Sequence, residues 1–212
     1  MLRYFLIIIC ILAAVPLMAK GKDMSKYDFN KVSSFIESGI TKGEYPGASL
    51  LVEHKGKIVF QQSWGTYCSR TQRDVPVDKD VYHMMFSVSK GISATVIVIA
   101  HQKGLIDYDA PLSKYIPEYK GKWKDTCTIR KLLTHSAGIP SCPLGPVTTP
   151  ETWKAAVDTC CNYQVEWEPG SKTAYHGTQG VFLAAEAVLH ASGLPDWDTV
   201  CKKFLFDPIG AK

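Results

Sequence analysis

Ser87 and Lys90 are the residues whose types and spacing most clearly suggest chemistry. They stand three positions apart in Ser-Val-Ser-Lys, which is the only Ser-x-x-Lys in the chain. On a helix, side chains three residues apart share a face, so the Lys90 amine can approach the Ser87 hydroxyl. A lysine can accept a serine proton when burial or a neighbouring cation lowers the lysine pKa. The pair therefore predicts a nucleophilic serine with a lysine as its base.

The segment after Ser87 has the pattern of the helix that this pairing needs. Its apolar residues recur at helical spacing: Val88, Ile92, Val96 and Ile99. Gly104 supplies a C-terminal stop. A helix start also favours the negative charge that develops during acyl transfer. Apolar neighbours such as Phe86 predict that Lys90 is buried, whereas the alternative interpretation makes Ser87 an N-cap and Lys90 a solvated first-turn residue.

The rest of the sequence predicts one hairpin and several more helices. Two β-rich runs over 47–65 flank a turn at Gly56, which is typical of an antiparallel hairpin. Helical periodicity predicts helices over 27–41, 128–135 and 177–191. A further helix should begin near Thr149 or Pro150.

Two segments resemble a known family, namely FSVSKGISATVIVIAHQKGLIDYDAPLSKYIPEY and TIRKLLTHSAGIP. They are similar to the serine β-lactamase-related family, which includes class C β-lactamases, DD-peptidases and esterases. The resemblance implies one domain over 27–212 with an α/β (α+β), β-lactamase/transpeptidase-like fold, in which helices flank an antiparallel sheet and form a helical subdomain. It also implies a sheet that is incomplete at the C-terminus, because the sequence ends at PIGAK before the family's Lys-Thr-Gly-like or His-x-Gly-like segment.

The resemblance also implies catalytic roles. Ser87 would be acylated and Lys90 would take its proton. Tyr175, in KTAYHGTQG, falls where the family carries Tyr-x-Asn, and it would assist proton transfer to the leaving group. A phenol has an ordinary pKa near 10 and needs adjacent cations to work as a base, and Lys90 could be that cation. The alternative is that Tyr175 is an aromatic residue packed on the core at a helix entry.

Gly177 departs from the family pattern, because it stands where the motif has Asn. The side-chain amide that would orient a substrate carbonyl is therefore absent. This departure favours ester hydrolysis over β-lactam hydrolysis. His176 is predicted to replace part of the lost polar contact, so both residues are candidate substrate-binding positions.

His135, in LLTHSAGIP, permits a different arrangement. A Ser-His-Asp triad could combine it with Ser87 and with Asp107 or Asp109. The resemblance instead places the His135 loop beside the site as an element that shapes substrate binding. We favour this second interpretation.

These residues predict a serine hydrolase that acts through an acyl-enzyme on an ester, amide or peptide bond. Its partner would be a small-molecule or peptide substrate, and the chemistry needs no metal and no organic cofactor. The alternative is a catalytically inactive, truncated homologue that acts as a binding or scaffold protein, which Gly177 and the early C-terminus would suggest. A net charge of +4 without a basic, aromatic-containing stripe argues against nucleic acid as a partner.

The N-terminus predicts export. Arg3 precedes a short apolar run, and small residues follow up to Ala19, so residues 1–19 have the pattern of a signal peptide. The mature protein would be secreted or periplasmic, without stable membrane insertion, whereas the alternative is an uncleaved anchor. Removing Cys10 from the seven cysteines leaves an even number, which predicts disulfides in an oxidising compartment without fixing their pairing.

Overall fold

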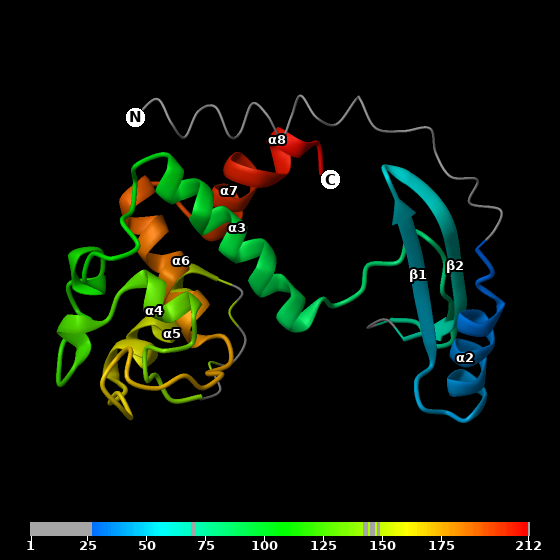
Figure 1. Ribbon diagram of the computed structural model, residues 1–212, viewed down its shortest axis with the longest axis horizontal. Coiled ribbons are helices and arrows are strands. Elements are labelled where there is room, and N and C mark those ends of the chain that lie inside the picture. The colour runs from blue at the N-terminus through cyan, green and yellow to red at the C-terminus, as the bar shows by residue number, and fades with distance from the viewer. Residues whose placement is uncertain (1–26, 69–70, 142–143, 145–146, 148, 212) are drawn as a thin grey trace. The chain divides into compact units, whose positions relative to one another are not determined.

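The computed structural model describes residues 27–68, 71–141, 144, 147 and 149–211. The predicted signal peptide lies outside these residues. The chain divides between His83 and Met84 into two compact units, and each is described by itself. Figure 1 shows the sheet in the first unit and most of the helices in the second.

The first unit is a helix followed by a small antiparallel sheet. Helix α2 (Asn30–Thr41) precedes strands β1 (Gly47–His54), β2 (Lys57–Tyr67) and β3 (Val75–Pro76), which are ordered β1-β2-β3. The β1–β2 turn contains Gly56, whose φ of 74° suits glycine. The predicted hairpin is therefore confirmed. Strand β3, which pairs with β2, was not predicted.

The second unit is helical in its described part. Its longer helices are α3 (Ser89–Gln102), α5 (Pro150–Asn162) and α6 (Gln179–Ser192). The shorter elements, in chain order, are η2 (Phe86–Val88), η3 (Leu112–Lys114), η4 (Lys124–Thr126), α4 (Ile129–Leu133), α7 (Trp197–Cys201), η5 (Lys202–Phe206) and α8 (Asp207–Ile209). Each helix predicted from periodicity is present, with ends that differ by a few residues.

Helix α6 forms the centre of this unit. Its buried face is made of small and aliphatic side chains, Leu183, Ala184, Ala187 and Val188, which join the same core cluster as residues of α3 and α4. The buried residues of α3 are Val96, Ile97 and Ala100. The predicted inward face of α3 is therefore partly wrong: Val88 is 62% exposed, because it lies in η2 before the regular helix begins.

Helix α5 begins where its sequence predicts. Thr149 is the N-cap, and the Thr149 and Thr152 side chains form a reciprocal capping box. Pro150 occupies the first turn, where its missing N–H costs no hydrogen bond. This cap fixes the start of a helix that lines the pocket described below.

No disulfide joins two of the described cysteines, so the predicted disulfides are not found among them. Four of them are buried and pack as small apolar side chains: Cys127, Cys160, Cys161 and Cys201. Cys68 is exposed, and Cys142 lies outside the described residues.

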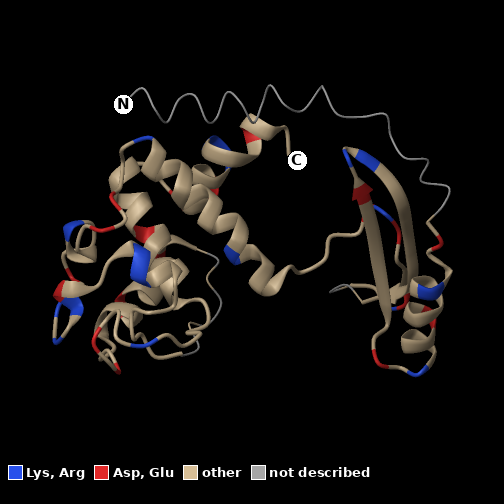
Figure 2. Ribbon diagram, viewed as in Figure 1, with Lys and Arg blue, Asp and Glu red and all other residues tan. Residues whose placement is uncertain are grey.

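Both units contain basic and acidic residues along their chains (Figure 2). No helix in that part is long and apolar enough to cross a membrane. The same part of the chain contains no group of three or more His, Cys, Asp or Glu side chains placed to hold a metal ion.

Candidate active site

The structure brings together the three residues predicted to be catalytic. Ser87 lies in η2, Lys90 in the first turn of α3, and Tyr175 in the loop before α6. Lys90 Nζ donates to Ser87 Oγ at 2.9 Å, and the Ser87 and Tyr175 hydroxyl oxygens are 2.8 Å apart. Both contacts have the length of good hydrogen bonds. The serine oxygen therefore lies between an amine and a phenol.

The backbone immediately before Ser87 adopts an uncommon conformation. Phe86 has a φ of 43°, which costs a non-glycine residue about 1–3 kcal/mol and is concentrated at functional sites. The N-cap interpretation of Ser87 does not fit, because Val88 precedes α3 and provides no side-chain cap. The Ser87 hydroxyl instead contacts Lys90 and Tyr175.

Tyr175 is a surface group with altered acidity. Its side chain is 60% exposed, so the alternative of a tyrosine packed in the core is wrong. Hydrogen bonding from Lys90, and then from Ser87, lowers the Tyr175 pKa from its ordinary value near 10. The Lys90 Nζ lies 5.2 Å from the centre of the Tyr175 ring, within the range of a cation–π interaction. The phenol of Tyr175 is thus more acidic than that of an ordinary tyrosine.

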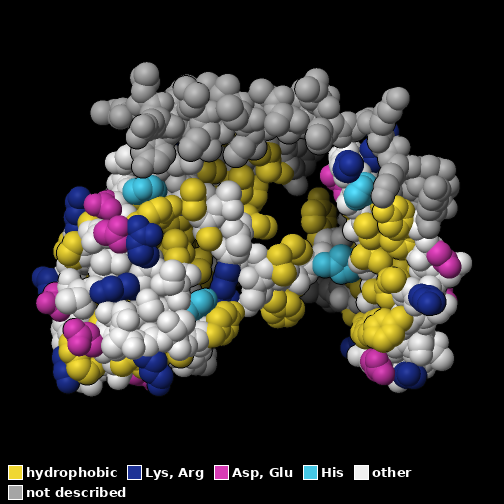
Figure 3. All heavy atoms as spheres, viewed as in Figure 1, with side chains coloured by type: hydrophobic (Ala, Val, Ile, Leu, Met, Phe, Trp, Pro, Cys, Tyr) yellow, Lys and Arg dark blue, Asp and Glu magenta, His cyan; other side chains and the backbone are white. Residues whose placement is uncertain are grey.

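Lys90 is only half-buried, so the predicted deep burial of its amine is not found. Phe86, which was expected to cover the amine, is 78% exposed, and nearby Met84 is 77% exposed. Figure 3 shows hydrophobic side chains gathered at the N-terminal end of α3. The Ser87 hydroxyl therefore lies near an apolar surface rather than inside the core.

The His135 ring packs against the Tyr175 ring. The two ring centres are 4.7 Å apart, and the His135 carbonyl accepts the Ala174 N–H at 3.0 Å. Burial, followed by the charge of Lys90, lowers the His135 pKa. His135 thus holds the loop that carries Tyr175, while its role in shaping substrate binding stays a prediction.

The alternative Ser-His-Asp triad is not assembled. The Asp109 carboxylate is bound by Arg130 through two hydrogen bonds of 2.6 and 2.7 Å. His135 Nδ1 is buried, and no hydrogen bond to it is made within the described part of the chain. A triad needs a carboxylate at this nitrogen to orient the ring.

His176 is buried where the sequence predicted a substrate contact. It is 2% exposed, and its ring centre is 4.4 Å from that of His135. A Cβ at Gly180 would lie 2.1 Å from His176 Cε1, so the ring fills the space that this glycine leaves. Burial, then His135, lowers the His176 pKa to about 4. The contact role is corrected to a packing role, and Gly180 four residues later was the available sequence signal.

Gly177 adopts a left-handed backbone conformation with a φ of 61°. A Cβ at this position would lie 2.9 Å from Gln179 Oε1 and 3.1 Å from Ser141 Oγ. A residue with a side chain at position 177 would therefore crowd Gln179 and Ser141, and glycine avoids this crowding.

Solved structures with the same architecture define the fold. A putative β-lactamase from Bacteroides dorei aligns with a TM-score of 0.74 at 24% identity, over 87% of this chain and 52% of that chain. A family VIII carboxylesterase aligns with a TM-score of 0.67 at 28% identity, over 86% of this chain and 49% of that one. The fold is thus β-lactamase/transpeptidase-like, as predicted.

The family follows from the sequence match. The Beta-lactamase family model matches residues 32–212, so the chain belongs to the β-lactamase family. The esterase/β-lactamase LipL of Mycobacterium tuberculosis is 43% identical over 95 residues, which are 45% of this chain and 22% of LipL. The chain thus spans about half the length of the similar solved structures and about a fifth of this curated relative.

Proposed function

We propose that this protein is a serine hydrolase that acts through an acyl-enzyme, with esters as its preferred substrates. The observation that carries the proposal is the position of Ser87 Oγ, 2.9 Å from Lys90 Nζ and 2.8 Å from the Tyr175 hydroxyl. This arrangement gives the nucleophile two groups that can exchange its proton. The names of the similar esterase/β-lactamase and carboxylesterase, together with Gly177 in place of Asn, favour ester bonds.

The proposed cycle has two halves. In the first, Ser87 Oγ attacks the ester carbonyl while its proton passes to Lys90 or Tyr175, and the alcohol leaves with a proton returned through Tyr175. In the second, water attacks the acyl carbon and gives a proton to the same pair; the bond between the acyl carbon and Ser87 Oγ then breaks, the pair returns the proton to Oγ, and the carboxylic acid is released. The Ser87 N–H, in η2 just before α3, would stabilise the oxyanion in both halves.

The proton path explains why Tyr175 and Lys90 act as a unit. Contact with Lys90 lowers the Tyr175 pKa, so a phenolate forms more readily than in free tyrosine. Because Lys90 also donates to Ser87, the serine hydrogen is free to point at the phenol oxygen. Loss of Lys90 would therefore lower the nucleophilicity of Ser87 and the acidity of Tyr175.

The test is covalent labelling of the purified protein with a fluorophosphonate, followed by intact mass. We expect one adduct on the parent, none on Ser87→Ala, and labelling slowed about 100-fold in Lys90→Ala, the scale of a lost general base. Ser34→Ala in α2 and Lys103→Ala at the far end of α3 are the matched controls, and both should label like the parent. A folded parent, verified by circular dichroism, that takes no label would replace the proposal with a binding or scaffold role.

We infer in addition that the chain is exported and that residues 1–19 are removed as a signal peptide. The support is the sequence pattern that ends in small residues near Ala19. The intact mass of protein recovered from a secreting host reports this cleavage directly. A mass that retains the first 19 residues would contradict it.

A further inference from the structure

A pocket of about 830 Å³ opens within the second unit and is lined in part by Lys90. Its volume is in the range of small-molecule sites, which is about 300–1,000 Å³. Phe86 and Lys90, which flank Ser87 in the sequence, both line it, and so does Thr178 from the loop that carries Tyr175. The pocket therefore reaches Lys90, whose Nζ lies 2.9 Å from Ser87 Oγ.

The interior of the pocket is aromatic. Trp153 of α5 packs against Phe182 of α6, with ring centres 4.1 Å apart, and lies 6.5 Å from Trp197 of α7. Val181 and Leu189 add aliphatic surface from α6. Such walls bind apolar groups by removing them from water.

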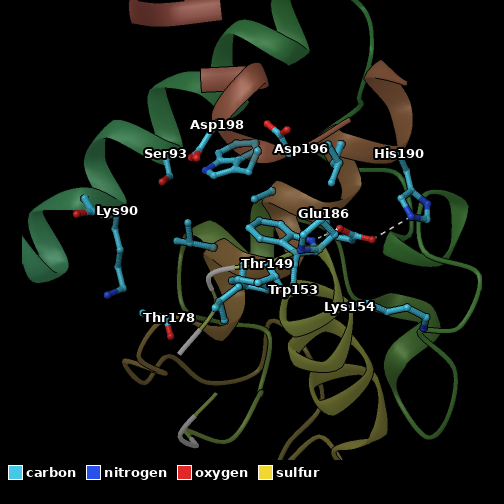
Figure 4. Close-up of a pocket in the computed structure, with 18 of the residues that line it drawn as sticks. Lys90, Ser93, Thr149, Trp153, Lys154, Thr178, Glu186, His190, Asp196 and Asp198 are labelled. Carbon is cyan, nitrogen blue, oxygen red and sulfur yellow. Dashed lines mark hydrogen bonds and ion pairs between the residues drawn. The ribbon is translucent and has the colours of Figure 1, made fainter. Parts of the chain in front are cut away.

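The buried carboxylate of the pocket is already engaged. Glu186 is 8% exposed and accepts the Trp153 indole N–H at 2.6 Å. Its other oxygen contacts His190 Nε2 at 2.9 Å. Figure 4 shows these two contacts on the side of the pocket away from Lys90. The contacts hold Trp153 in place and leave the carboxylate oxygens bound to the protein.

Two charged groups at the rim of the pocket, those of Asp196 and Lys154, also have partners within the protein. Asp196 caps α7 by accepting the Thr199 N–H at 2.7 Å, and Lys154 bonds Asp158 at 2.8 Å. Lys90 is thus the charged group of the pocket that contacts the proposed nucleophile. A ligand with a carbonyl at one end and an apolar chain at the other matches this distribution.

We propose that this pocket binds the acyl part of the substrate and selects esters of apolar carboxylic acids with medium-length chains. The inference rests on the proposed function, because the carbonyl must lie at Ser87 when the chain enters the pocket. Each methylene buried contributes about 0.8 kcal/mol, which corresponds to about a fourfold gain in rate or affinity until the pocket is filled.

Alkyl fluorophosphonates of increasing chain length test the selection. We expect the second-order rate of Ser87 labelling to rise from the methyl to the butyl to the octyl probe, by up to about fourfold per methylene. Val181→Phe reduces the pocket volume and should flatten the ratio of octyl to methyl rates. Val98→Phe, on an exposed position of α3, is the matched control and should keep that ratio.

The outcomes separate the two proposals. Labelling of Ser87 at one rate for all chain lengths, or an unchanged ratio in Val181→Phe, overturns the acyl pocket and leaves the serine hydrolase intact. Absence of labelling by every probe contradicts the hydrolase, and the pocket is then judged by binding alone.

Binding is measured with octanoate and Ser87→Ala, following the fluorescence of Trp153 and Trp197 in the pocket. The pocket is supported if octanoate causes a saturable change in tryptophan fluorescence that is lost in Val181→Phe and kept in Val98→Phe. No change with octanoate overturns it. Tighter binding of 8-aminooctanoate than of octanoate also overturns it. The pocket carboxylates, those of Glu186, Asp196 and Asp198, would then recognise an amine, and the pocket would not select an apolar chain.

Discussion

At the scale of single residues, His176 shows how burial changes the role of a polar side chain. Its sequence position beside Tyr175 suggests a substrate contact, yet the ring fills the space above Gly180 and packs on His135. Neither of its ring nitrogens has a hydrogen-bond partner among the described residues. A buried imidazole in this state is expected to be neutral.

We predict that this histidine makes stability depend on pH. Its folded pKa is about 4 against an ordinary value of 6.5. Between these pH values the unfolded chain binds a proton at this histidine that the folded chain does not. The folded state therefore has its full stability above pH 6.5 and loses stability as pH falls toward 4. Urea unfolding at pH 7.5 and 4.5 should show a loss of about 2–3 kcal/mol from this site.

His176→Leu removes this titration, so its unfolding free energy should change less between the two pH values than that of the parent. His54→Leu in β1 is the control and should retain the parent's full change. Equal pH dependence in the parent and His176→Leu would contradict a neutral, buried His176.

At the scale of elements, every helix predicted from periodicity is present, because amphipathic spacing and caps are local properties, whereas short helices such as α7 and α8 were not predicted. Thr149 and Pro150 marked the start of α5, and a glycine marked the hairpin turn. Features that depend on distant residues were not predictable in this way. Strand β3 is too short to show a period, and it exists only through its pairing with β2.

The packing of α6 against its surroundings gives a matched pair of glycine variants. A Cβ at Gly180 would lie 2.1 Å from His176 Cε1 and 3.0 Å from the Leu132 carbonyl oxygen, whereas Gly91 in α3 has open space. We expect Gly180→Ala to lower the unfolding free energy by about 1–3 kcal/mol through overpacking. Gly91→Ala should raise it by about 0.5–1 kcal/mol, because alanine favours the helix.

Chemical unfolding monitored by circular dichroism measures both changes. The two substitutions add the same methyl group to helices of the same length. If both variants shift stability in the same direction, the close approach of His176 to α6 is wrong.

At the scale of the whole molecule, the residues proposed for chemistry and the pocket beside them belong to one compact unit, which begins at Met84. The sequence predicted the convergence of Ser87, Lys90 and Tyr175 through a family resemblance, since 85 residues separate Lys90 from Tyr175. Spacing alone could join only Ser87 to Lys90. The strained Phe86 backbone and the aromatic pocket depend on tertiary packing and had no local signal.

The thiols of the molecule give a prediction about its redox state. Burial raises the pKa of Cys127, Cys161 and Cys201 to about 11, so little thiolate is present at pH 8. Exposed Cys68 should therefore react rapidly with Ellman's reagent in the native protein, and Cys68→Ser should lose that phase. The buried thiols should react only after denaturation. If they require a reductant as well, they are paired in disulfides and the free-thiol state is wrong.

The conformation of Gly177 decides what an asparagine would meet at this position. Asparagine tolerates a left-handed backbone better than most residues, so the main chain itself would accept the family's Asn. The obstacle is the first carbon of its side chain, which would crowd the Gln179 amide and the Ser141 hydroxyl. An asparagine at this position would therefore require the Gln179 amide to shift, so the site accepts the family's residue only together with a rearranged neighbour.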